Sequence, residues 1–190
     1  DEGKWISSTY YMQELPEWLN ELNQKNTANS YLQKSWETLL PISTYTESIA
    51  DDNPYEKTFE GEKTPVFPHN LPVLRKDNKN YDLIKHTPFG NTILKELAFE
   101  VIKNEQMGKD AITDLLTVSF SSPDYIGHQF GPYSVEIQDT YLRLDKEIAE
   151  LLIFLEKQVG ENEFMVFLTA DHGVVDVPQH AIDNNIPAGY

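Results

Sequence analysis

The 190-residue chain contains no cysteine and few basic residues for its length. The lack of cysteine excludes disulfide bonds, a thiolate nucleophile and cysteine-ligated zinc. There are 15 lysines and arginines against 31 aspartates and glutamates, which gives a formal net charge of −16 at pH 7. Because nucleic acids and anionic membranes bind clustered basic residues, this charge argues against both as partners.

The sequence also lacks any apolar run of membrane-spanning length. Its mean hydropathy of −0.49 and its 39% of hydrophobic residues are ordinary for a soluble protein, and its length allows one domain with a sizeable core. It does not begin with Met, and its first residues have neither the basic nor the apolar region of a signal peptide. We therefore expect a processed or excised chain.

Residues 1–87 lack long periodic stretches and are rich in proline and turn residues. Apolar spacing predicts short helices over 14–24 and 28–36. Proline, aspartate and asparagine interrupt most of 51–80, which indicates loop structure. We therefore expect 1–87 to be an irregular, partly helical region, inserted into or covering a larger fold.

Residues 88–190 are more regular and predict an α/β fold class. Apolar periodicity indicates helices over 91–103 and 134–159, and short apolar runs indicate strands over 115–119 and 164–168. A strand–helix–strand order with one long helix is by default a right-handed βαβ unit with parallel strands. We therefore expect 88–190 to be an α/β core whose two strands end at the same edge of a sheet.

An aspartate and a histidine follow each predicted strand. Asp124 and His128 lie in an expected loop over 124–131. They are four residues apart, so one helical turn would point both the same way. Asp171 and His172 are adjacent and precede Gly173, which permits unusual backbone angles. Carboxylates and imidazoles are ordinary zinc ligands, and strand ends are where α/β proteins place their sites. The two pairs together resemble half of a two-metal hydrolytic centre.

Each pair also has a simpler interpretation, and the other candidate residues are weaker. Asp124 and His128 fit a capped helix start with a surface histidine, and Asp171 and His172 fit a turn. His180 follows the second pair closely in the sequence. It would either support a metal ligand through a hydrogen bond or serve only as a helix cap or a surface residue.

The other polar residues suggest no chemistry. His69 and His86 fit a solvated loop and a turn. The acidic residues of the long predicted helix mostly fit a solvated face; they are Glu136, Asp139, Asp145 and Glu147. Asp145 lies between apolar positions, so capping or bracing a neighbouring loop is an alternative for it.

Two motifs resemble a known family. Residues 122–132 (SPDYIGHQFGP) resemble the D-x-x-G-H-x-x-G segment of the type I phosphodiesterase/nucleotide pyrophosphatase group of the alkaline phosphatase superfamily. Residues 169–173 (TADHG) resemble the T-[SA]-D-H-G motif of the same superfamily. Residues 5–11 and 15–18 resemble the phosphate-irrepressible, PafA-like bacterial alkaline phosphatases, on less distinctive residues. The resemblance covers most of the chain and is densest over 88–190.

The resemblance implies part of an α/β/α sandwich with a mostly parallel sheet and two zinc ions at its edge. Asp124 and His128 would bind one zinc, with a further histidine, whereas Asp171 and His172 would bind the other, with an N-terminal aspartate and the nucleophile. The activity implied is hydrolysis of small phosphate esters through a covalent phospho-Thr or phospho-Ser. Family members of this branch are exported, which implies a periplasmic or secreted protein.

The chain departs from the family in what it lacks. The family's nucleophile, its first aspartate and its last histidine ligand have no counterpart here. We therefore expect a fragment of a larger enzyme that is inactive by itself. Alternatives are a phosphodiesterase or nucleotide pyrophosphatase, a sulfatase-like or manganese mutase-like enzyme, and a stand-alone binding or scaffold domain with a degenerate site.

Overall fold

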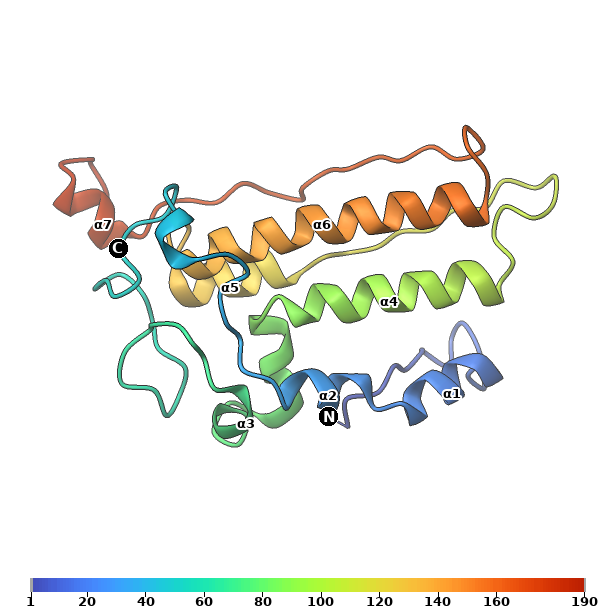
Figure 1. Ribbon diagram of the computed structural model, residues 1–190, viewed down its shortest axis with the longest axis horizontal. Helices are drawn as coiled ribbons and strands as arrows, with labels where there is room; N and C mark the ends of the chain where they lie inside the picture. Colours follow the sequence, from blue (N-terminus) through green and yellow to red (C-terminus); the bar gives the residue numbers. More distant parts are fainter. Residues whose placement is uncertain (1, 190) are drawn as a thin grey trace.

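The structure, a computed structural model, describes residues 2–189 and consists of helices joined by long extended segments (Figure 1). The α-helices are α1 (Glu17–Gln24), α2 (Thr27–Leu32), α3 (Leu71–Leu74), α4 (Phe89–Asn104), α5 (Ser122–Phe130), α6 (Val135–Gln158) and α7 (Pro178–Asp183). Two 3-10 helices, η1 (Ile42–Thr44) and η2 (Asn80–His86), lie between them. The helices predicted over 14–24, 91–103 and 134–159 are confirmed within three residues at each end, and the one over 28–36 is shorter.

Helices α4 and α6 run side by side and form the long axis of the molecule (Figure 1). The rings of Phe99 and Phe154 stack between them, with their centroids 4.2 Å apart. Lys95 of α4 forms an ion pair with Glu150 of α6. Ring stacking and an ion pair therefore join the two helices.

Helix α6 begins at a side-chain cap. The Ser134 hydroxyl accepts a hydrogen bond from the backbone N–H of Ile137 at 3.1 Å and donates to the carbonyl of Gly131 at 3.0 Å. Ser134 is 2% exposed, so solvent cannot replace these bonds. The cap fixes the turn between α5 and α6.

Replacing Ser134 by alanine should lower the free energy of unfolding by about 1–2 kcal/mol, because loss of a buried N-cap costs this much. Urea denaturation followed by circular dichroism measures the change. Ser7→Ala, at an exposed position, is the matched control and should change stability by less than about 0.5 kcal/mol. Equal stability of the two variants would show that the cap contributes nothing.

The hydrophobic core lies between the short helices of the N-terminal half and helix α5. It is built around Trp36, which is fully buried and contacts Phe130 of α5 edge to face. The buried members of the core are Ala28, Leu32, Trp36, Phe59, Leu71, Leu74, Leu83, Ile84, Ile126 and Phe130. One core therefore contains residues from both sides of the expected boundary at residue 87, and that boundary stays a prediction.

The sheet expected from the sequence is not confirmed. Within residues 2–189 the β-pairing is a single antiparallel bridge between Trp36 and His69. The segments 115–119 and 164–168 are extended and run along α6 without a ladder between them (Figure 1). Leu115 and Phe167 are each 86% exposed. A strand needs a neighbour in space to bond its backbone, and these segments have none among the described residues.

The carboxylates predicted to form a solvated face of α6 are mostly buried, and that prediction is wrong. Glu136 and Asp139 are 0% exposed and Glu147 is 7% exposed, whereas Asp145 is exposed as predicted. Buried carboxylates require partners. The loops that precede α4 supply them for Glu136 and Asp139, and Thr92 of α4 bonds Glu147. The periodicity of α6 alone does not reveal these partners.

Asp139 is the most highly bonded of these carboxylates. It accepts hydrogen bonds from Trp36 Nε1 at 2.8 Å, Tyr45 Oη at 2.5 Å and Arg143 Nε at 2.6 Å. The backbone N–H of Leu39 adds a fourth bond at 2.7 Å. Asp139 thus ties residues 36–45 to α6.

None of the helices described is both long and apolar enough to cross a membrane.

Candidate functional site

Helix α5 presents Asp124 and His128 on one face. Pro123 stands in the first turn, where its missing N–H costs nothing. The i, i+4 spacing brings His128 Nε2 to 3.5 Å from Asp124 Oδ1. Both side chains are open to solvent, with 46% of Asp124 and 79% of His128 exposed. The geometry expected from the spacing is confirmed.

The second pair lies close to the first, at the end of the extended segment that follows α6. His172 follows the extended stretch after α6, and its Nε2 lies 3.7 Å from Asp124 Oδ1. The same nitrogen lies 3.7 Å from Asp171 Oδ2. Asp124 therefore stands between the histidines of two segments that are far apart in the sequence. The chain brings the four predicted residues into one neighbourhood.

His172 is oriented by its own loop. Its Nδ1 lies 2.8 Å from the carbonyl oxygen of Gly173, so this nitrogen carries a proton and Nε2 faces the carboxylates. The Gly173 carbonyl, then Asp171, and more weakly Asp124, raise the pKa of His172. Gly173 has no positive φ, and a Cβ there would have open space. The backbone freedom expected of this glycine is therefore not used.

The four side chains, two carboxylates and two imidazoles, are of types that bind metal ions. Separations of 3.5–3.7 Å between nitrogen and oxygen are too long for good hydrogen bonds. Within the pairs, the 3.5 Å between His128 and Asp124 and the 3.7 Å between His172 and Asp171 are close to the roughly 3.4 Å that separates two ligands of one tetrahedral zinc with bonds of about 2.1 Å. Across residues 2–189, however, no three His, Asp or Glu side chains are arranged to hold one ion. These donors therefore form incomplete pairs, each of which needs further ligands.

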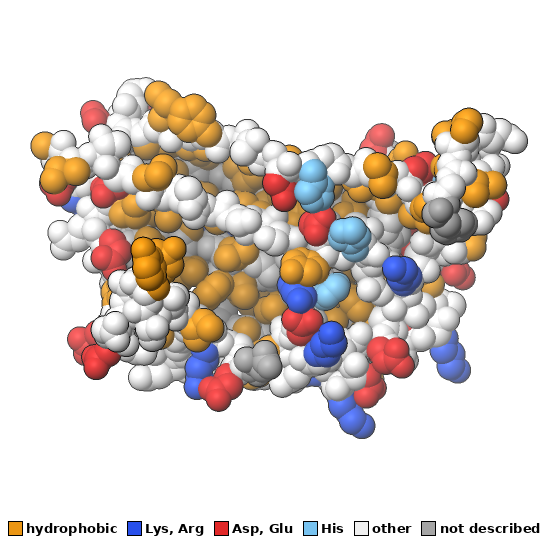
Figure 2. Space-filling model, turned by 180° about the vertical axis from the view of Figure 1, so that it is seen from behind, with side chains coloured by type: hydrophobic (Ala, Val, Ile, Leu, Met, Phe, Trp, Pro, Cys, Tyr) orange, Lys and Arg blue, Asp and Glu red, His pale blue; other side chains and the backbone are white. Residues whose placement is uncertain are grey.

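The site lies on an open face of the molecule. Histidine side chains gather there beside carboxylates (Figure 2), and the two exposed histidines of the chain are His128 and His172. The open face leaves room for the further ligands that each incomplete pair needs.

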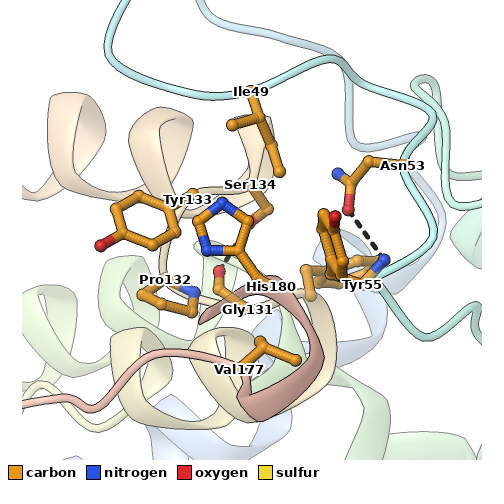
Figure 3. A pocket seen from close by; sticks show the side chains of 10 residues that line it. Ile49, Asn53, Tyr55, Gly131, Pro132, Tyr133, Ser134, Val177 and His180 are labelled. Atoms are coloured by element: carbon orange, nitrogen blue, oxygen red, sulfur yellow. Dashed lines mark hydrogen bonds between the residues drawn. The ribbon is translucent and has the colours of Figure 1, made fainter. Parts of the chain in front are cut away.

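His180 lies in a separate pocket at α7. Its Nδ1 is 2.9 Å from Asp176 Oδ1, and its ring packs against Tyr55 and Tyr133, each with a centroid separation of 4.9 Å (Figure 3). The partners of this ring come from the segment just before α7 and from loops beside α5. Its expected role of supporting a metal ligand stays a prediction, since the contacts described for its ring do not include the four candidate ligands.

Near Asp124, the next residue on α5 packs against η2. The ring of Tyr125 contacts the imidazole of His86, with centroids 5.3 Å apart, and Lys85 Nζ lies 4.6 Å from the Tyr125 ring centroid. His86 ends η2 and is half-buried. Its burial lowers the pKa of His86, so the ring is neutral at pH 7. These contacts fix the position of α5 against η2.

Sequence reasoning missed a fully buried histidine. His69, expected in a solvated loop, is 0% exposed and lies 3.0 Å from Glu62 and 3.0 Å from Glu136. Its neighbours in sequence are a proline and an asparagine, which indicate a turn. The only sequence signal was Glu136 itself, which stands between two apolar residues at the start of α6.

Comparison with known proteins assigns the chain to a family. The model of the type I phosphodiesterase / nucleotide pyrophosphatase family matches residues 3–187. The chain is 50% identical over 190 residues to a protein of Myroides odoratus named calcium-transporting ATPase, and covers 34% of it. It is 48% identical over 187 residues to alkaline phosphatase PhoV of Synechococcus elongatus, and again covers 34%.

A third relative has a solved structure. The chain is 46% identical over 189 residues to alkaline phosphatase PafA of Elizabethkingia meningoseptica. A crystal structure of wild-type alkaline phosphatase PafA matches 98% of this chain and 36% of its own chain, with a TM-score of 0.92 at 45% identity. The fold is therefore alkaline-phosphatase-like, and the chain spans about a third of the length of these relatives. The chain belongs to the type I phosphodiesterase / nucleotide pyrophosphatase family.

Proposed function

We propose that the protein to which this chain contributes is a metal-dependent hydrolase of small phosphate esters, an alkaline phosphatase. The observation that carries the proposal is the convergence of Asp124, His128 and His172 at 3.5–3.7 Å in a fold shared with PafA. Relatives that match almost the whole chain at 46% and 48% identity are named alkaline phosphatases, which supports the reaction class.

The four side chains would hold two zinc ions. Asp124 and His128 would ligate one, and Asp171 with His172 the other, each completed by residues from the rest of the protein. Bound zinc ions would activate the nucleophile and neutralise the charge of the leaving oxygen in displacement at phosphorus. The chain's own contribution is to place the donors. Helix α5 fixes the first pair, and the bond between His172 Nδ1 and the Gly173 carbonyl orients the second histidine.

The two extended segments would be strands of the whole protein. We propose that 115–119 and 164–168 join a mostly parallel sheet in an α/β/α sandwich. Their exposed apolar side chains, including Leu115, Met165 and Phe167, support this, because large exposed apolar surfaces mark places where another part of a protein packs. Both segments lead directly into the candidate ligands, so the sheet would place the ligands at one edge.

A phosphodiesterase or nucleotide pyrophosphatase is the second candidate, because the matching family model carries that description. The difference lies in how the non-reacting oxygens of the phosphoryl group are bound. A monoesterase binds a dianion, whereas a diesterase leaves room for a second ester group. The chain's own −16 charge favours neither substrate, since bound cations invert the local field.

Kinetics of the full-length protein tests the proposal. We expect p-nitrophenyl phosphate to be hydrolysed with a larger kcat/KM than bis-p-nitrophenyl phosphate or ATP. Dialysis against a chelator should abolish the activity, and added zinc should restore it. A faster diester reaction would favour the second candidate. Activity that survives complete metal removal would contradict a metal-dependent hydrolase of either kind.

The remaining expectations are secondary proposals. The substrate would be a small phosphate ester, with no nucleic acid or membrane as partner, and the protein would be periplasmic or secreted. The absence of cysteine from the sequence is compatible with export. The 190 residues alone would be inactive. Measurable hydrolysis by this polypeptide that Asp171→Asn removes would contradict that proposal.

A further inference from the structure

A buried cluster of acidic groups surrounds His69 beneath the α5–α6 junction. His69 bridges Glu62 and Glu136, with nitrogen–oxygen distances of 3.0 Å to each. Asp51 and Glu56 interact electrostatically with the same histidine. We call Asp51, Glu56, Glu62, His69 and Glu136 the His69 cluster. It contains four carboxyl groups and one imidazole, so it cannot be neutral unless it holds protons.

Three carboxyl oxygens of the His69 cluster are buried without a hydrogen-bond partner. They belong to Asp51 (Oδ1), Glu56 (Oε2) and Glu136 (Oε2). An ionised oxygen in this position would lose its hydration without gaining a hydrogen bond. A proton on the carboxyl group removes the charge and supplies a donor for a neighbouring oxygen. The geometry therefore favours a protonated cluster.

Burial and neighbouring charges also favour a protonated cluster, because they raise the pKa values of its groups. Burial, and then repulsion from Glu136, raise the pKa of Glu56 to about 9. Burial also raises the pKa of Glu136 and of Asp51, and exposed Asp52 adds repulsion on Asp51. Burial opposes the charge on His69, but hydrogen bonds to Glu136 and Glu62 outweigh it and raise the pKa of His69 to about 9.

The His69 cluster joins residues 48–69 to the helices. Asp51 and Glu56 lie in the first part of this segment, Glu62 and His69 in the second, and Glu136 at the start of α6. Three other groups bond the cluster: Asn53 Nδ2 donates to Glu56, the backbone N–H of Phe67 donates to Asp51 at 3.2 Å, and the backbone N–H of Phe59 donates to Glu62 at 3.3 Å.

The same segment is bonded to the end of α5. Gln129 Nε2 donates to the carbonyls of Lys57 and Thr58 at 3.0 and 2.8 Å, and Lys57 N–H donates to the Gln129 carbonyl at 3.0 Å. Ile49 N–H donates to the Tyr133 carbonyl at 2.9 Å. Gln129 follows His128 directly, so the segment also holds the turn of α5 that carries this histidine.

We propose that the His69 cluster is a proton-dependent contact that holds residues 48–69 against the α5–α6 junction and releases them at alkaline pH. The sign follows from linkage. Each raised pKa means that the closed form binds protons more tightly than the open form. The stabilisation is complete below the pKa values of the open form and is lost as pH rises toward about 9, the pKa of Glu56 and His69 in the closed form.

Hydrogen exchange of the full-length protein, followed by mass spectrometry at pH 7 and pH 9, tests the proposal. After correction for base catalysis, exchange in peptides from 48–69 should rise at least about tenfold, since one released proton increases opening tenfold per pH unit. Peptides from α4 should show no corrected rise, which separates local release from global unfolding.

Two substitutions identify the groups responsible. Glu56→Gln keeps the size of the side chain and removes its titration, so the corrected rise should be at least about threefold smaller than in the wild type. Glu60→Gln, an exposed position of the same segment, should behave as the wild type. Glu136→Gln provides a second test from α6 and should also reduce the rise. No rise in the wild type, or an equal rise in wild type, Glu56→Gln and Glu136→Gln, would overturn the proposal.

Discussion

Replacing Asp139 by alanine should lower the free energy of unfolding by about 3–5 kcal/mol, the cost of breaking a buried ion pair by removing one partner. Asp139 is fully buried and accepts four hydrogen bonds, from Trp36, Leu39, Tyr45 and Arg143. Its loss leaves these donors without an acceptor and leaves Arg143 without its charge partner. The change removes the link between residues 36–45 and α6.

Urea denaturation of the protein, followed by tryptophan fluorescence, measures this loss. Asp145→Ala is the matched control, because Asp145 lies on the same helix and is exposed. It should change stability by less than about 0.5 kcal/mol. Asp139→Asn should fall between the two, since the amide keeps one acceptor but directs its NH₂ group at a donor. Equal effects of Asp139→Ala and Asp145→Ala would show that the buried bonds contribute nothing net.

Replacing Asp171 by asparagine should reduce kcat/KM of the full-length protein for a phosphate monoester by at least about 10³-fold, because a catalytic metal ion contributes several kcal/mol. The amide keeps the shape of the side chain but not its charge. His128→Ala should cause a loss of similar size through the other pair. Metal content measured by mass spectrometry should fall together with activity.

The control for this prediction is Glu161→Gln, which removes one exposed negative charge in the turn after α6. It should retain full activity and metal content. Circular dichroism should show that all three variants are folded. If Asp171→Asn kept activity within about tenfold of the wild type, Asp171 would not be a metal ligand, and the two-metal account would fail.

The helices and the site pairs were the most predictable parts of the molecule. Helices α4 and α6 follow directly from apolar residues at 3.6-residue spacing, whereas the loop expected over 124–131 is wrong, because Ser122–Phe130 form helix α5. The order of elements suggested that the second pair would lie nearby, and His172 lies 3.7 Å from Asp124. Local periodicity and chain order were sufficient for these features.

Strand pairing and polar burial were not predictable in the same way. The apolar runs over 115–119 and 164–168 are typical of buried strands. A hydrogen-bonded ladder, however, depends on neighbouring strands that these runs do not specify. The pattern of α6 predicted Glu136 and Asp139 on a solvated face, because periodicity alone cannot show which loops cover a helix. His69 is buried by segments on both sides of it in the sequence. All of these depend on tertiary contacts between distant residues.

The central claim is that Asp124, His128, Asp171 and His172 hold two metal ions. The most direct test is a crystal structure of the full-length protein with zinc, with anomalous diffraction measured at the zinc edge. The account predicts two anomalous peaks, one within about 2.2 Å of Asp124 and His128 donors and the other equally close to donors of Asp171 and His172. Zinc bound elsewhere in the protein, with neither pair in contact with a peak, would contradict it.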